Sequence, residues 1–138
     1  MSHPERELSP RQNQAFQSQL LQQSQQQLTL NQYQQLALTT AMYPDKGKQN
    51  HNGMNYTILK LNGEAGEVAE KWGKCLRGDY PIATAKEMLR WEIGDVLWYI
   101  AALASEMGMT LEQVAEANLE KLKDRKSRGK IQGNGDTR

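Results

Sequence analysis

The sequence is short of the residues on which several classes of protein depend. Its 138 residues include a single cysteine, Cys75, which excludes an internal disulfide framework and favours a reducing, cytoplasmic compartment. The two histidines, His3 and His51, fall in an expected tail and an expected loop, so no Glu-x-x-His pair exists for a metal that needs nitrogen ligands. No apolar run reaches the length of a membrane helix, and the N-terminus lacks the apolar core of a signal peptide. We therefore expect a soluble cytoplasmic protein with no membrane partner.

An excess of charge of one sign is also lacking. Seventeen basic and sixteen acidic residues leave a formal net charge of +1. So small a net charge gives no overall field that would attract nucleic acid or an anionic membrane. Nucleic acid is not expected as a partner, and any function that depends on charge must depend on a local group of residues.

Apolar residues are sparse at the start of the chain, and glutamine is abundant there. The length suits one domain, and the composition divides the chain into a glutamine-rich arm (1–28), a single domain (29–128) and a C-terminal tail (129–138). The arm is expected to be either disordered or helical only on a partner.

From residue 29 onward, apolar residues recur at helical spacing, and no alternating strand pattern occurs. Thr29 and Gln32 form a capping box at the start of a first helix, which is expected to stop near Tyr43 because Pro44 follows. Asp45 to Gly53 is expected to be a loop.

Three further helices are expected, over about 54–76, over about 83–107, and from residue 110 to near residue 128. Gly108 is a good C-terminal cap for the third, and Thr110 with Gln113 forms a capping box for the fourth. Short connections between four helices predict an all-α, four-helix-bundle-type fold.

Two pairs of carboxylates stand out on consecutive helices. Glu64 and Glu67 are three residues apart, and so are Glu92 and Asp95, so each pair shares one helical face. Apart from Glu92 and Asp95 themselves, every residue from 91 to 104 is apolar or glycine, which predicts a helix buried nearly all round. Buried carboxylates stay ionised only beside a cation.

Several cations meet this requirement. Lysines and arginines on the same two helices are one choice: Lys71, Lys74, Lys86 and Arg90. A divalent metal is the more complete choice, because four oxygen donors without histidine or thiolate suit Mg²⁺, with Mn²⁺ as a substitute. Such metals hold substrate phosphates and stabilise the leaving group in phosphoryl chemistry. The alternative is that the acids lie on solvated helix faces and bind nothing.

The last helix supplies positive charge. Asn118, Lys121 and Arg125 recur at steps of three or four and can line one face that grips a triphosphate, with Lys74 on the second helix as a further substrate-binding residue. Basic residues near the end of a helix also stabilise its dipole, which is the alternative explanation. Aromatic side chains can stack on a base or simply form core: Trp72, Trp91, Trp98 and Tyr99.

Taken together, residues 29 to 136 resemble the MazG-like nucleoside triphosphate pyrophosphohydrolases. The mark of that family is Glu-x-x-Glu followed after a gap by Glu-x-x-Asp, and a later Asn-x-x-Lys-Leu-x-x-Arg segment matches residues 118–125. Some members have a further Glu where this chain has Gly63, so the number of metal ions stays open. Residues that fall on the family's magnesium ligands are Glu64, Glu67, Glu92 and Asp95, and those that fall on its substrate-binding segment are Asn118, Lys121 and Arg125.

The resemblance implies an all-α enzyme that hydrolyses a nucleoside triphosphate to the monophosphate and pyrophosphate, in homodimers or homotetramers that complete the sites. Likeness to phage-type members favours dGTP or GTP, with base preference otherwise open. A carboxylate-bridged di-iron bundle is the enzymatic rival, and the missing histidines count against it. The non-enzymatic rival is a helical interaction module that uses the glutamine-rich arm and the basic C-terminus.

Overall fold

Four helices make up the computed structural model, which describes residues 28–132, and no strand occurs among them. They are α2 (Leu30–Leu38), α3 (His51–Leu76), α4 (Ile82–Glu106) and α5 (Leu111–Ser127). The all-α prediction is therefore confirmed. The expected arm lies outside the described residues except for Leu28, and most of the expected tail lies outside them too. None of the described helices is both long and apolar enough to span a membrane.

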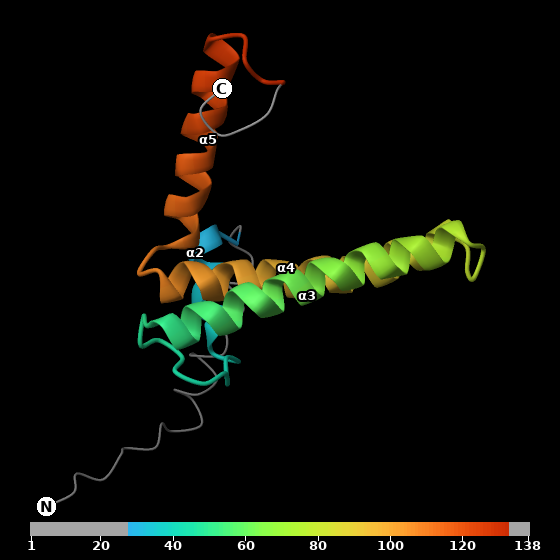
Figure 1. Cartoon of the computed structure of the whole chain (residues 1–138), viewed down its shortest axis with the longest axis horizontal. Helices are drawn as coiled ribbons and strands as arrows, with labels where there is room; N and C mark the ends of the chain where they lie inside the picture. Colours follow the sequence, from blue (N-terminus) through green and yellow to red (C-terminus); the bar gives the residue numbers. More distant parts are fainter. Residues whose placement is uncertain (1–27, 133–138) are drawn as a thin grey trace, which may run out of the picture.

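The two long helices, α3 and α4, pack side by side as an antiparallel hairpin (Figure 1). A tight turn joins them, and Gly78 occupies it with a φ of +88°, a conformation that favours glycine. Tyr80 closes this turn by donating its hydroxyl hydrogen to the carbonyl of Lys71 (2.6 Å). The hairpin is therefore the longest unit of the molecule, and it fixes which residues of α3 face which residues of α4.

The short helix α2 and the last helix α5 pack on one end of this hairpin. Buried Gln34 of α2 joins them, because its amide donates to the carbonyls of Ala101 and Met109 and its oxygen accepts from the N–H of Leu111. Beyond its first turns α5 projects away from the hairpin (Figure 1), and it packs on α2 and α4 but not on α3. Within one chain, the four helices therefore do not close into the expected four-helix bundle.

The core lies at the same end of the hairpin. Ala41, Tyr43 and Ala102 are buried there, with Leu38, Tyr56 and Trp98 packed against them. Within the described part of the chain, no further helix packs over the remaining length of the hairpin. Trp91 and Ile93 are accordingly 68% and 55% exposed. The expectation that α4 is buried nearly all round was wrong for a single chain. The sequence shows that the helix is apolar, but it does not show which other elements pack against it.

Helix boundaries follow local hydrogen bonds. Both predicted capping boxes, Thr29 with Gln32 and Thr110 with Gln113, are present. However, α2 ends at Leu38 and not near Tyr43, and the hydroxyls of Thr39 and Thr40 donate to carbonyls of its last turn.

The start of α3 also differs from the prediction. It begins three residues earlier than expected, at His51, because the Asn50 side chain accepts the N–H of Gly53 as an N-cap. The end of α4 agrees better, since Gly108 has the φ of +69° that suits the predicted cap.

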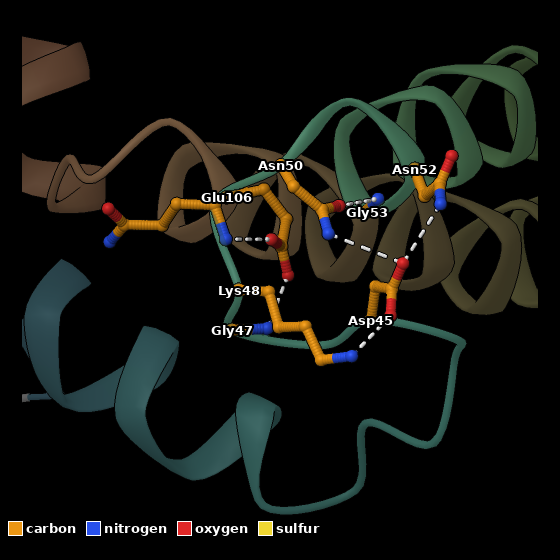
Figure 2. A network of polar contacts seen from close by, with 8 residues as sticks. Asp45, Gly47, Lys48, Asn50, Asn52, Gly53 and Glu106 are labelled. Atoms are coloured by element: carbon orange, nitrogen blue, oxygen red, sulfur yellow. Dashed lines mark hydrogen bonds and ion pairs between the residues drawn. The ribbon is translucent and has the colours of Figure 1, made fainter.

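One buried carboxylate ties the loop between α2 and α3 to the end of α4. Glu106 is 1% exposed and accepts a hydrogen bond from the Tyr43 hydroxyl (2.6 Å). It also accepts hydrogen bonds from the N–H groups of Gly47 (2.7 Å; Figure 2) and Gln49 (3.1 Å). Burial of a carboxyl group without hydrogen bonds is costly, and these three donors offset that cost. The loop is thereby held on the helix end.

Asp45 stabilises the same loop through hydrogen bonds on its outer side. Its carboxylate accepts hydrogen bonds from Lys48, Asn50 and Asn52 (Figure 2). These bonds, that from Lys48 foremost, lower the pKa of Asp45 to about 2, so the brace is charged at any physiological pH.

Replacing Glu106 by Gln is expected to lower the free energy of unfolding by about 2 kcal/mol, because charge-assisted bonds are lost and an amide N–H₂ is placed among donors. Urea denaturation at a fixed chain concentration measures this. The matched control is Glu116→Gln on the exposed side of α5, with a change within about 0.5 kcal/mol. Equal stabilities for the two variants would contradict the assigned role of Glu106.

Candidate functional site

The hairpin brings three of the four predicted carboxylates together. One oxygen each of Glu64, Glu67 and Glu92 lie within 4.8 Å of one another, and no other such grouping of potential metal ligands occurs among residues 28–132. We call these three residues the acid cluster. Glu64 and Glu67 occupy one face of α3 at a spacing of three, and Glu92 faces them from α4. The cluster therefore depends on both helices and on the register of the hairpin.

Asp95 lies one turn beyond Glu92 on α4, is exposed, and is not one of the three clustered residues. Its charge nevertheless reaches its neighbours. After burial, the charge of Asp95 is the second cause that raises the pKa of Tyr33 on α2. The negative region thus extends from the acid cluster toward α2.

Two lysines lie near the acid cluster without neutralising it. Lys60 Nζ is 3.8 Å from an oxygen of Glu64, and Lys71 Nζ is 3.5 Å from an oxygen of Glu92. Charge-assisted hydrogen bonds are shorter, about 2.7 to 2.9 Å. The side chains of Glu64 and Glu92 are only 13% and 14% exposed, so water solvates them incompletely. Three close carboxylates with two loosely placed lysines leave negative charge for a further cation to balance.

A small divalent ion fits this donor set. The ligands of octahedral Mg²⁺ lie at about 2.0 to 2.1 Å, which separates ligand oxygens by roughly 3 to 4 Å. The three oxygens of the acid cluster all lie within 4.8 Å of one another, so at most a modest side-chain rotation is needed to close them around an ion. The donors are oxygens alone, which suits Mg²⁺ or Mn²⁺ better than a metal that prefers nitrogen or sulfur.

The other predicted binding residues lie apart from the acid cluster within one chain. Asn118 and Lys121 are exposed on α5, and Arg125 is 6% exposed on the same helix, which does not pack on α3. Lys74 is on α3, but it pairs with Glu70 at 2.6 Å, and the hydrogen bond from this partner raises the pKa of Lys74. One chain therefore offers the carboxylates without bringing the residues of α5 to them.

The aromatic candidates are divided between surface and core. Trp72 and Trp91 are exposed, and the Arg90 guanidinium lies 4.9 Å from the centre of the Trp91 ring. Trp98 packs in the core and donates its indole N–H to the Ala37 carbonyl (3.1 Å). Tyr99 is the aromatic candidate that lies beside the carboxylates, since the charges of Glu64 and Asp95 both contribute to raising its pKa.

Sequence reasoning did not single out Lys60, Tyr33 or Tyr56 as neighbours of the carboxylates. Lys60 carried a usable signal, since it precedes Glu64 by four residues and so lies on the same helical face. Tyr56 carried the same signal, since it precedes Lys60 by four residues and Glu64 by eight on α3. Tyr33 lies on α2, and only the packing of α2 against α4 brings it near. No local pattern marks Tyr33.

Comparison with known proteins gives a family and one informative relative. Residues 52–129 match the family model described as the MazG nucleotide pyrophosphohydrolase domain. This range contains the acid cluster, Asp95 and the candidate residues of α5. The chain is also 44% identical over 109 residues to the Gene 37 protein of Mycobacterium phage L5, an alignment that covers 77% of this chain and 96% of that protein. No solved structure matches the chain.

The acid cluster predicts a measurable affinity for Mn²⁺ used as a probe. Isothermal titration of the full chain is expected to detect binding that weakens at least about tenfold in Glu92→Gln, because one of three charged donors is lost. Glu87→Gln is the matched control, since Glu87 lies on the same helix but pairs with Arg90 at the surface. Equal affinities in the Glu92 and Glu87 variants would rule out the acid cluster as the binding site.

Proposed function

The chain belongs to the MazG nucleotide pyrophosphohydrolase domain family, and from this premise we propose that it hydrolyses a nucleoside triphosphate to the monophosphate and pyrophosphate with Mg²⁺ held by the acid cluster and Asp95. The observation that carries the proposal is the convergence of three carboxylate oxygens between α3 and α4, with two lysines no closer to them than 3.5 and 3.8 Å. Mn²⁺ has the same ligand preference and is proposed as a substitute.

The roles of the metal ion, the carboxylates and the basic residues follow from their charges. When bound, the divalent ion supplies Lewis-acid stabilisation of the negative charge on the phosphate oxygens. The carboxylates hold it, and one of them accepts a proton from the attacking water. The water oxygen forms a bond to the α-phosphorus while the bond from that phosphorus to the β-phosphate oxygen breaks, so pyrophosphate leaves with the bonding electrons. Asn118, Lys121 and Arg125 grip the phosphates of the substrate, and Lys74 adds positive charge at the other end of the site.

We propose a guanine nucleotide, dGTP or GTP, as the first substrate to test. The support is the phage origin of the relative that is 44% identical. A panel of the common ribo- and deoxyribonucleoside triphosphates ranks the preference directly by the release of pyrophosphate.

A second copy of the chain is proposed to complete each site, in a homodimer or homotetramer. The support is threefold: α5 does not pack on α3, the far half of the hairpin exposes Trp91 and Ile93, and an apolar groove of about 730 Å³ lies open where α4 meets α5. Met107, Val114 and Ala117 are among the residues that line this groove. Apolar surface of this extent is typical of a face that another chain covers.

Asp95→Asn is expected to abolish turnover while the helical structure stays intact, because Asp95 is exposed and its loss leaves no cavity. The rate of pyrophosphate release at saturating Mg²⁺ should fall at least about 100-fold, since even a residue that only supports a metal ligand contributes 10- to 100-fold. Circular dichroism checks the fold.

Asp79→Asn, at the exposed turn of the hairpin, is the matched control and should keep full activity. An active Asp95→Asn protein would count against the assignment of Asp95. Absence of pyrophosphate from the wild-type protein with every nucleotide, with or without Mg²⁺, would favour the interaction-module alternative.

Mixing two variants tests whether sites are shared between chains. Lys121→Ala alone is expected to weaken substrate retention and so raise KM. Equal amounts of the Asp95→Asn and Lys121→Ala proteins are unfolded together and refolded, so that half of the dimers contain one chain of each. If α5 acts on the neighbouring chain, each mixed dimer has one site free of both substitutions. The expected activity at low substrate is then about a quarter of the wild-type value. Activity no higher than the mean of the two separate variants would show that each site uses one chain only.

A further inference from the structure

Two lysines flank the acid cluster along one face of α3. Lys60, Glu64, Glu67 and Lys71 follow one another at steps of four, three and four residues, a spacing that places all four on the same side of the helix. Glu92 faces this row from α4, since one of its oxygens lies within 4.8 Å of oxygens of Glu64 and Glu67. The acids therefore lie in the middle of the row, with a lysine about one turn beyond each end.

Lys71 is the better placed of the two lysines. Its Nζ lies 3.5 Å from Glu92 Oε1 and its side chain is 24% exposed, whereas Lys60 Nζ lies 3.8 Å from Glu64 Oε1 and the Lys60 side chain is 48% exposed. The ion pair of Lys71 joins α3 to α4, while that of Lys60 stays within α3. The backbone at Lys71 is also fixed, because its carbonyl accepts the hydroxyl hydrogen of Tyr80 at 2.6 Å. Lys71 is therefore the cation that the hairpin itself holds at the acid cluster.

The contact of Lys71 is loose enough to be exchanged. The next lysine along α3, Lys74, has its Nζ 2.6 Å from Glu70, as short as a charge-assisted hydrogen bond. The 3.5 Å separation between Lys71 and Glu92 is too long for such a bond, so the ammonium of Lys71 loses little when it changes partner. Lysine suits an exchange of this kind, because its ammonium is a point charge on a flexible stem and needs no fixed geometry.

We propose that Lys71 is the counterion of Glu92 while no metal is bound, and that it turns to the polyphosphate of the substrate once a divalent ion occupies the acid cluster. The ion and the ammonium compete for the same carboxylate and repel each other, so each weakens the binding of the other. A nucleoside triphosphate on the ion brings phosphate oxygens to the cluster, and lysine is a common partner of phosphate. This inference rests on the proposed function, because it requires a divalent ion at the acid cluster and a phosphate substrate on that ion.

The signature of this exchange is a pair of effects of opposite sign in Lys71→Met, which removes the charge and nearly keeps the length of the side chain. Titration of the full chain with Mn²⁺ alone, without nucleotide, should show binding that is about three- to tenfold tighter, because a positive charge beside the ion is gone. The KM for the nucleotide at saturating Mg²⁺ should rise about tenfold or more, because a hydrogen bond to a charged phosphate is lost. A residue that only supports the fold would weaken both kinds of binding.

Three further variants serve as comparisons. Lys71→Arg keeps the charge, so its Mn²⁺ affinity should stay within about twofold of the wild-type value. Lys60→Met should tighten Mn²⁺ binding by less than Lys71→Met, since Lys60 is farther from its carboxylate and more exposed. Lys86→Met, at an exposed position of α4, is the matched control and should change neither the Mn²⁺ affinity nor KM.

Mn²⁺ affinity that is unchanged or weaker in Lys71→Met, or an unchanged KM, would overturn the inference and leave the proposed function standing. Circular dichroism checks that the variant is folded, and if it is not, the same two measurements on Lys71→Gln decide by the same criteria. No Mn²⁺ binding and no pyrophosphate release by the wild-type protein would instead refute the proposed function itself.

Discussion

Like charges held close together by a rigid pair of helices are the constraint on which the rest of this molecule depends. The hairpin of α3 and α4 fixes Glu64, Glu67 and Glu92 with oxygens inside 4.8 Å of one another. Carboxylates so placed, two of them largely shielded from water, repel one another unless a cation joins them. Lys60 and Lys71 approach at distances too long for strong ion pairs. The hairpin therefore holds negative charge that a cation from outside the chain can balance, and the cation that we propose is a divalent ion bound to a polyphosphate.

The same hairpin explains why one chain looks incomplete. Its packed core occupies one end, where α2, the loop fixed by Glu106 and the start of α5 meet α4. The acid cluster lies near the middle of the hairpin. From there to the turn, no further element among residues 28–132 covers the two helices, and large apolar side chains lie exposed. The homo-oligomer that we propose would cover the apolar side chains exposed on this hairpin. It would account for the exposed Trp91 and for an α5 that projects away from the hairpin.

Much of the fold was predictable because its signals are local. The capping boxes at Thr29 and Thr110 and the cap at Gly108 depend on residues within one turn, and all three are found where the sequence indicates. The predicted helix boundaries were wrong where a side chain offered a competing hydrogen bond, as Thr39 does at the end of α2.

The approach of Glu64 to Glu92 was also predictable from the sequence, because acidic residues at matching positions of two adjacent antiparallel helices face each other. The burial of α4 was predicted wrongly, because burial depends on which other helices pack against it. The role of the buried Glu106 could not be predicted for the same reason, since its partners Tyr43, Gly47 and Gln49 come from a distant segment.

The most direct test of the central claim is a crystal structure of the full chain grown with Mn²⁺ and a non-hydrolysable nucleoside triphosphate, with anomalous data collected at the manganese edge. The account predicts an anomalous peak between α3 and α4, within coordination distance of carboxylate oxygens of Glu64, Glu67 and Glu92 and of a phosphate oxygen. Manganese bound elsewhere, with the three carboxylates turned outward into solvent, would contradict it.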